Sequence, residues 1–191
     1  MKFFKRLTAV VFSVIMLLCF ASCKGETETK VQNTLNANGS TLTAHTFLDE
    51  YKADPDVNAN KITGFGFTAD EFNEKFVKNG SWNAYTFKVS FGNSNDFGIT
   101  AFGIDIKENG MKNVFVSTAG DAVMGLPANF TSTQDMYCKV IADSALSETD
   151  VIKTLGKMGI EIMYVNASTG AEDLSEVEQG ELLYCPVDFI M

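Results

Sequence analysis

The chain contains 191 residues, a length typical of a single domain. Hydrophobic residues make up 46% of it, which is enough to build a sizeable core and argues against disorder. The 24 acidic residues outnumber the 15 basic ones, so the formal net charge is −9 at pH 7. Because an acidic surface repels phosphate backbones, the composition argues against a nucleic-acid partner.

The N-terminal segment has the layout of a secretory signal peptide. Lys2, Lys5 and Arg6 form a basic start, and residues 8–20 (TAVVFSVIMLLCF) form an apolar run. This run is shorter than the ~20 apolar residues that a membrane-spanning helix needs. It ends at the sequence Phe20-Ala21-Ser22-Cys23, after which the chain becomes polar.

The four residues Phe20-Ala21-Ser22-Cys23 resemble the lipobox of bacterial lipoproteins, in which an aliphatic and two small residues precede an invariant cysteine. Phe20 departs from the usual leucine. The resemblance implies that residues 1–22 are removed and that Cys23 carries a diacylglyceryl group. It further implies export to the bacterial cell envelope and attachment to its inner or outer membrane through the lipid. The alternatives are an ordinary signal peptide, with Cys23 a spare thiol, and an uncleaved anchor helix.

The mature part divides into a linker and a globular domain. Residues 23–41 are predicted to be a flexible tether, because they carry few large apolar side chains and no helical periodicity. Residues 42–191 are predicted to form the globular domain, which begins with a short helical segment at 46–53.

Two helix starts are marked by capping sequences. Thr68 to Glu71 has the pattern of a capping box that precedes Phe72, and Asn79-Gly80 is a predicted stop. Ser147 to Asp150 begins a second amphipathic helix, which is predicted to end at Gly159.

Most other segments alternate with a period of two and predict strands. These segments are 84–91, 97–106, 113–118, 135–142, 160–166 and 181–190. A change of phase predicts a bulge near 101–103, and Asn109-Gly110 predicts a tight hairpin. We therefore expect a mainly β domain, an antiparallel immunoglobulin-like β-sandwich with one or two short connecting helices.

Several short patterns suggest cofactors or metals. Residues 64–69 (GFGFTA) fit the outline of a dinucleotide fingerprint, but no acidic residue follows at the required spacing. We expect no cofactor there and interpret the glycines as a bend beside two packing phenylalanines. Asp54, Asp56 and Asn58 place oxygens as in the start of a calcium loop, yet Ala59 stands where an EF-hand needs glycine. A solvated turn is the alternative to a calcium site, and we expect no other metal.

The two cysteines of the globular domain, Cys138 and Cys185, both fall in predicted strands. Export to an oxidising compartment would permit a disulfide between them. The alternative is two buried thiols that behave as small hydrophobic groups.

Trp82 is the only tryptophan, and with Tyr85 it follows a Gly-Ser turn. Exposed aromatic rings stack on sugars, so this pair is a candidate ligand-stacking site; a packed core tryptophan is the alternative. The sequence thus favours a lipid-anchored, non-catalytic binding or structural module with a protein or glycan partner. A carbohydrate-binding module and an anchored hydrolase with a carboxylate pair are the other hypotheses.

Overall fold

The computed structural model describes residues 35–109, 111–119, 124–178 and 180–189, which belong to one compact unit, Thr34–Met191. The predicted signal peptide, Cys23 and the first part of the predicted tether lie outside the described residues. No helix in the described part of the chain combines the length and apolarity needed to cross a membrane.

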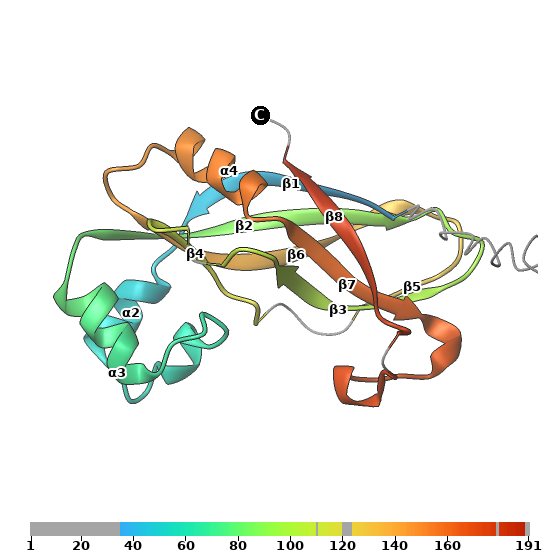
Figure 1. Cartoon of the computed structure of the whole chain (residues 1–191), viewed down its shortest axis with the longest axis horizontal. Coiled ribbons are helices and arrows are strands. Elements are labelled where there is room, and N and C mark those ends of the chain that lie inside the picture. The colour runs from blue at the N-terminus through green and yellow to red at the C-terminus, as the bar shows by residue number, and fades with distance from the viewer. Residues whose placement is uncertain (1–34, 110, 120–123, 179, 190–191) are drawn as a thin grey trace, which may run out of the picture. The chain divides into compact units, whose positions relative to one another are not determined.

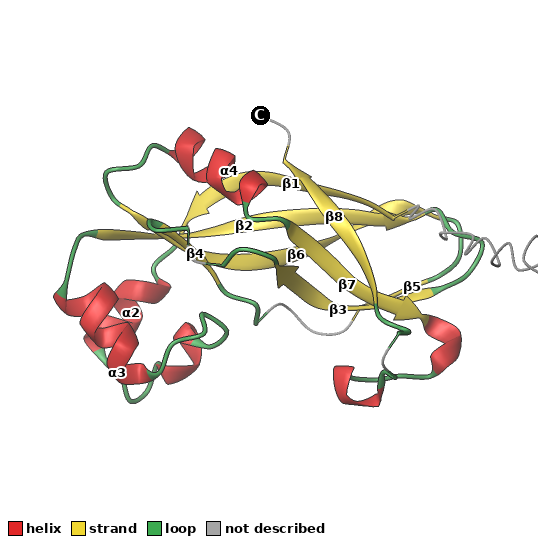
Figure 2. Cartoon of the chain, viewed as in Figure 1, coloured by secondary structure: helices red, strands yellow, loops and turns green. Residues whose placement is uncertain are grey.

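Within the described residues, eight strands form one curled sheet (Figures 1 and 2). In chain order they are β1 (Leu35–Ala44), β2 (Trp82–Asn93), β3 (Ile99–Ile106), β4 (Val114–Val116), β5 (Met124–Leu126), β6 (Phe130–Asp143), β7 (Ile160–Asn166) and β8 (Leu183–Phe189). Their order in the sheet is β4-β6-β2-β1-β8-β7-β3-β5. The pairing of β1 with β8 is parallel, whereas the other neighbours are antiparallel.

This topology confirms the mainly β class but does not confirm the immunoglobulin-like sandwich. A sandwich consists of two facing sheets, whereas here the strands are hydrogen-bonded in a single sheet. The reason is β1, which lies between β2 and β8 and joins the two groups of antiparallel strands.

The first strand also corrects the predicted tether, because residues 35–41 belong to β1. Leu35, Ala37 and Gly39 are buried at alternate positions, and the phase changes at a bulge before Leu42. The ring of Phe189 covers Gly39 so closely that a Cβ there would lie 2.5 Å from it. Alanine and glycine have little apolar surface, so the period of two was not visible in the sequence.

The three predicted helices are confirmed. The helices are α2 (Phe47–Ala53), η1 (Ala59–Ile62), α3 (Ala69–Phe72), which continues as the π-helix η2 (Asn73–Lys78), α4 (Glu148–Lys157), η3 (Ala167–Thr169) and η4 (Leu174–Glu176). In the capping box of α3, the Glu71 amide donates to Thr68 Oγ1 (3.3 Å) and the Thr68 amide donates to Glu71 Oε2 (2.9 Å). In α4, the Asp150 amide donates to Ser147 Oγ (3.2 Å).

The predictions for the loops had mixed outcomes. The bulge is confirmed, because the register of β3 shifts between Ala101 and Gly103. The hairpin at Asn109-Gly110 was wrong, since β3 and β4 are not neighbours in the sheet. The side chain of Asn109 instead donates to the Val116 carbonyl (3.1 Å) and accepts from the Val116 amide (3.4 Å). It thus provides hydrogen-bond partners for backbone groups of the edge strand β4.

Buried apolar residues form two clusters. The main core consists of the buried residues on one face of the sheet with Val151, Leu155 and Met158 of α4. The aromatic cluster consists of Phe47, Leu48, Tyr51, Ile62, Phe65, Phe72, Phe76, Phe115 and Ile141, with Phe67, Trp82 and Ala84 packed against it. Val140 and Ile141 are adjacent in β6 but belong to different clusters. Because successive strand residues point to opposite faces, α4 and the α2–α3 segment lie on opposite sides of the sheet.

Candidate ligand-binding site

Two cavities adjoin the segment Met111–Asn113, which precedes the edge strand β4. The first has a volume of about 670 Å³ and is bounded by the α3–η2 helix and the start of β2. The second has a volume of about 400 Å³ and lies between β4 and α4. Lys112 and Asn113 line both cavities. Both volumes fall within the ~300–1,000 Å³ typical of small-molecule sites.

Trp82 forms a fixed wall of the first cavity. It is the first residue of β2, directly after the loop that ends η2. Its indole Nε1 donates to the Lys75 carbonyl (3.1 Å) and the Asn79 carbonyl (2.8 Å). Its ring packs edge-on against Phe76 and Phe115, with centroids 5.0 and 5.9 Å away. With the indole nitrogen already bonded, Trp82 offers a ligand mainly its apolar surface.

Lys75 places an ammonium group among aromatic rings beside the same cavity. Its Nζ lies 4.5 Å from the ring centroid of Phe115, 5.5 Å from that of Phe67 and 5.9 Å from that of Phe76. In the described part of the chain this ammonium has no carboxylate partner. The rings therefore hold it through cation–π attraction.

Three carboxylates complete the first cavity: Glu71, Glu74 and Asp143. The hydrogen bonds from Thr68 lower the pKa of Glu71, and those from Lys78 and Asn79 lower the pKa of Glu74. Both groups are thus held as anions at neutral pH. Asp143 Oδ1 accepts from the amide of Ala145 (2.9 Å). Glu71 and Glu74 suit hydrogen-bond acceptance better than proton donation.

The second cavity has a different chemistry. Its apolar floor is formed by Met111, Val114 and Leu146. Lys112 and Lys157 supply its charges, and no carboxylate is among its described lining residues. Lys112 has a φ of +24°, a backbone conformation rare for a residue other than glycine.

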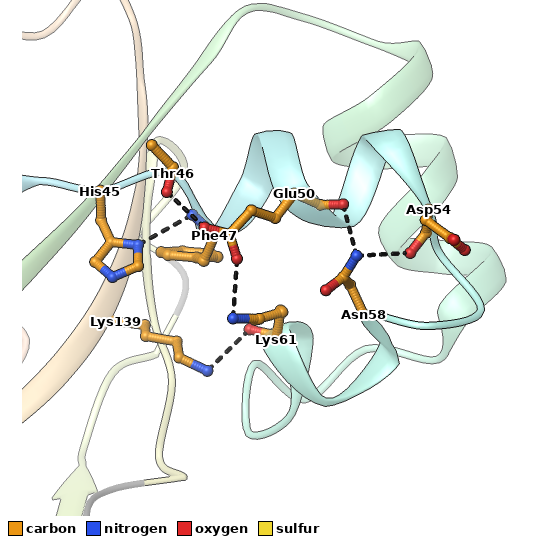
Figure 3. Close-up of polar contacts among 8 residues, drawn as sticks. All are labelled: His45, Thr46, Phe47, Glu50, Asp54, Asn58, Lys61 and Lys139. Atoms are coloured by element: carbon orange, nitrogen blue, oxygen red, sulfur yellow. Dashed lines mark hydrogen bonds and ion pairs between the residues drawn. The ribbon is translucent and has the colours of Figure 1, made fainter.

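The calcium candidates lie in the turn after α2, and Figure 3 shows two of them, Asp54 and Asn58. Asp54 Oδ1 accepts from the Val57 amide (3.2 Å), and the Asn58 amide group donates to the carbonyls of Glu50 (3.0 Å) and Asp54 (3.1 Å). Asp56 is exposed. Within the described residues, no group of three or more histidine, cysteine or acidic side chains is arranged to hold a metal. Asp54 and Asn58 stabilise the turn through these hydrogen bonds.

Figure 3 also places the single histidine. His45 Nδ1 accepts from the Phe47 amide (3.0 Å) at the start of α2. Glu50 pairs with Lys61 (2.9 Å), and Lys139 of β6 donates to the Lys61 carbonyl (3.1 Å). These contacts fasten α2 and η1 to the sheet.

Trp82 and Tyr85 do not form the stacking pair that the sequence suggested. They are three residues apart in β2 and therefore point to opposite faces of the sheet. Trp82 packs on the aromatic cluster and lines the first cavity, whereas Tyr85 is buried in the main core. Six of the other lining residues come from the adjoining segment 67–80, whereas Lys112, Asn113 and Asp143 come from segments distant in sequence. No single local motif therefore marks the whole site.

Cys138 and Cys185 are both buried as thiols rather than joined in a disulfide. Cys138 lies in β6 and Cys185 in β8, and strands β2 and β1 separate them in the sheet. The Cys185 thiol donates to the Leu35 carbonyl (3.0 Å), and burial raises its pKa to about 11. Such a thiol is an inert packing group at neutral pH.

Comparison with known proteins shows no match to this chain, either among protein-family models or among curated proteins.

Proposed function

We propose that the chain is a lipid-anchored protein of the bacterial cell envelope and that its globular unit is a non-catalytic binding module. The lipobox-like sequence ending at Cys23 supports the anchor. The observation that carries the binding role is the first cavity, where Trp82, Lys75 and fixed carboxylates adjoin a volume of about 670 Å³. A mostly preformed pocket that combines apolar walls with a few fixed polar groups is typical of ligand sites.

The direction of β1 is compatible with a binding module that is anchored at its N-terminus. The described chain enters the sheet at Leu35, which pairs with Asn93, and leaves β1 at Ala44, which pairs with Tyr85. Trp82 lies near the Ala44 end. A strand of this length spans roughly 30 Å. The proposed ligand site and the point where a lipid-bearing N-terminus would join the sheet are therefore at opposite ends of β1.

The anchor is tested by metabolic labelling with radioactive palmitate in a bacterial host. We expect label in the wild-type protein and in Cys19→Ala, a matched control that removes a nearby cysteine, but none in Cys23→Ala. Mass spectrometry of the wild type should give an N-terminus at a modified Cys23. Equal labelling of Cys23→Ala and wild type would overturn the anchor.

Carbohydrate binding is the second candidate, and one observation favours it: Trp82 lies beside polar groups that can bind hydroxyls. We expect a glycan-array hit of residues 30–191 to be lost in Trp82→Ala and kept in Tyr137→Ala, which removes an exposed aromatic ring outside the cavities. The hydrolase hypothesis lacks such support, because a carboxylic acid catalyst needs a raised pKa, whereas those of Glu71 and Glu74 are lowered.

A further inference from the structure

The second cavity opens where the edge of the sheet meets α4. Val114 is fully buried in the main core, and Met111 and Leu146 pack against that core. These three side chains form the floor of the cavity. An apolar group that enters from solvent therefore contacts the same layer of side chains that fills the sheet's inner face, and it gains hydrophobic burial there.

The charges at this cavity are unusual for so acidic a chain. Lys112 and Lys157 line it without any carboxylate among the described lining residues, although the formal net charge is −9. Neither lysine forms an ion pair within the described part of the chain. The first cavity, by contrast, has three carboxylates beside its two lysines. Of these two cavities, the second is the one whose described lining residues combine a net positive charge with an apolar floor.

A purely structural role accounts for one of the two lysines. Lys157 lies in the last turn of α4, where a cation complements the negative end of the helix dipole. Lys112 belongs to a different segment, next to the edge strand, and no helix ends there. The shared feature of the two lysines is the cavity that they line.

We infer that the second cavity binds an amphiphile with a short apolar chain and a single anionic head group, of which a medium-chain carboxylate is the simplest. This inference goes beyond the proposed function, whose site is the first cavity, and assigns a ligand class to the second cavity. The chain would contact Met111, Val114 and Leu146, and the head would lie between the ammonium groups of Lys112 and Lys157. A volume of about 400 Å³ suits one short chain rather than a two-chain lipid.

The test uses residues 30–191, because Thr34–Met191 is a compact unit that contains both hydrophobic clusters. The ¹⁵N-labelled protein is titrated with sodium octanoate and followed by NMR. Octylammonium reverses the charge of the head, 1-octanol removes it, and acetate removes the chain. We expect octanoate to bind about tenfold more tightly than octylammonium. The largest amide shifts should occur at Met111–Val114 and Thr154–Lys157.

Variants then identify the groups that recognise the head. Lys112→Gln/Lys157→Gln should weaken octanoate binding about tenfold and leave binding of 1-octanol unchanged. Lys153→Gln, which removes an exposed lysine of α4 outside the cavity, is the matched control and should bind octanoate as the wild type does.

Three results would overturn the inference: equal affinity for octanoate and octylammonium, shifts confined to another part of the protein, or a double variant that binds octanoate like Lys153→Gln. The comparison of octanoate with octylammonium needs only the wild type, so it decides the matter even if a variant fails to fold. If octanoate does not bind but a glycan does at Trp82, the proposed function stands and only this ligand class falls. Palmitate labelling tests the anchor independently.

Discussion

The two hydrophobic clusters lie on opposite faces of the same strands and are built from different side chains. The main core consists largely of aliphatic residues spread over the strands and α4. The aromatic cluster attaches the whole 47–78 segment to the sheet mainly through two sheet residues, Phe115 and Ile141. Since aromatic side chains each bury ~150–250 Å², a few of them can replace many aliphatic contacts. The attachment of the helical segment should therefore depend on a few aromatic rings. In the main core, by contrast, the stability should be spread over many aliphatic side chains.

The largest effect should come from Phe76, which contacts four other rings. The centroids of Phe67, Phe72, Trp82 and Phe115 lie 5.4, 4.7, 5.0 and 5.2 Å from its own. Phe76→Ala should lower the free energy of unfolding by about 3–5 kcal/mol, measured by urea denaturation of residues 30–191.

Phe87→Ala is the matched change in the main core, where Phe87 is equally buried but contacts the ring of Phe189. We expect a smaller loss than for Phe76→Ala. Because β4 and β6 contribute to both clusters, Trp82 fluorescence and far-UV circular dichroism should give the same unfolding midpoint in the wild type. Separate midpoints would show that the aromatic cluster unfolds on its own.

The next largest effect should come from Gly64, which lies in the helical segment and contacts residues 117–119, directly after the edge strand β4. Gly64 has a φ of +85°, and its carbonyl accepts from the Thr118 amide (2.9 Å). A Cβ at Gly64 would lie 2.3 Å from the backbone nitrogen of Ala119. Gly64→Ala should therefore cost about 2–4 kcal/mol, the sum of backbone strain and displacement of that segment.

Gly66 provides the control for that substitution. Its φ is +75°, but no atom lies within 4 Å of the position that its Cβ would take. Gly66→Ala should cost only the strain, about 1–2 kcal/mol. Equal losses for the two variants, measured by denaturation, would contradict the close packing of Gly64 against residues 117–119.

The helix caps should have a smaller effect. Thr68→Ala removes the capping box of α3 beside the aromatic cluster, and Ser147→Ala removes the cap of α4 over the main core. Each should cost about 1 kcal/mol in thermal or urea unfolding. Thr68→Ser and Ser147→Thr keep the oxygen and should restore most of the stability. If the alanine variants were as stable as the wild type, packing alone would fix these helix ends.

The fold was predictable where local chemistry and tertiary environment agree. The caps at Thr68 and Ser147 and the alternation of β2 were visible in the sequence because each depends on residues close together in the chain. The glycines of residues 64–69 do form a bend, with Phe65 buried and Phe67 partly buried. β1 was missed because Ala37 and Gly39 face the core with little apolar surface, and without β1 the single sheet could not be deduced.

The candidate site was less predictable than the fold. Trp82 was identified as a ligand-facing aromatic because it is unique in the chain, but its pairing with Tyr85 ignored the alternation of the strand. Lys75 was missed because its shortest ring contact, with Phe115, joins residues distant in sequence. Lys112 was missed because the residues that share its cavities come from distant segments. The sequence of a cavity wall assembled from several segments has no local pattern that distinguishes it from an ordinary surface.

The smallest effect should come from the outer face of β2 and β6, beyond the aromatic cluster. Asp135 accepts a hydrogen bond from Ser90 Oγ (2.6 Å) and pairs with Lys88 (3.2 Å). These contacts, the Ser90 hydrogen bond first, lower the pKa of Asp135 below its ordinary value of 3.8. Because the pKa is lowered by folding, the stability it provides is present above about pH 4 and is lost as the pH falls through the folded pKa. Asp135→Asn should cost about 0.5 kcal/mol at pH 7, since the pair is partly exposed.

The pH dependence separates this electrostatic effect from a packing defect. The difference in unfolding free energy between wild type and Asp135→Asn should shrink as the pH falls from 5 to 2.5, because protonated Asp135 resembles asparagine. In a Ser90→Ala background the same difference should vary less with pH, since the largest cause of the lowered pKa is removed. A difference that stayed constant from pH 7 to 2.5 would mean that Asp135 contributes through packing. In that case this face of β2 and β6 would be stabilised by packing at Asp135, as it is at the aromatic cluster. Charge would then not distinguish it from the face that bears the main core.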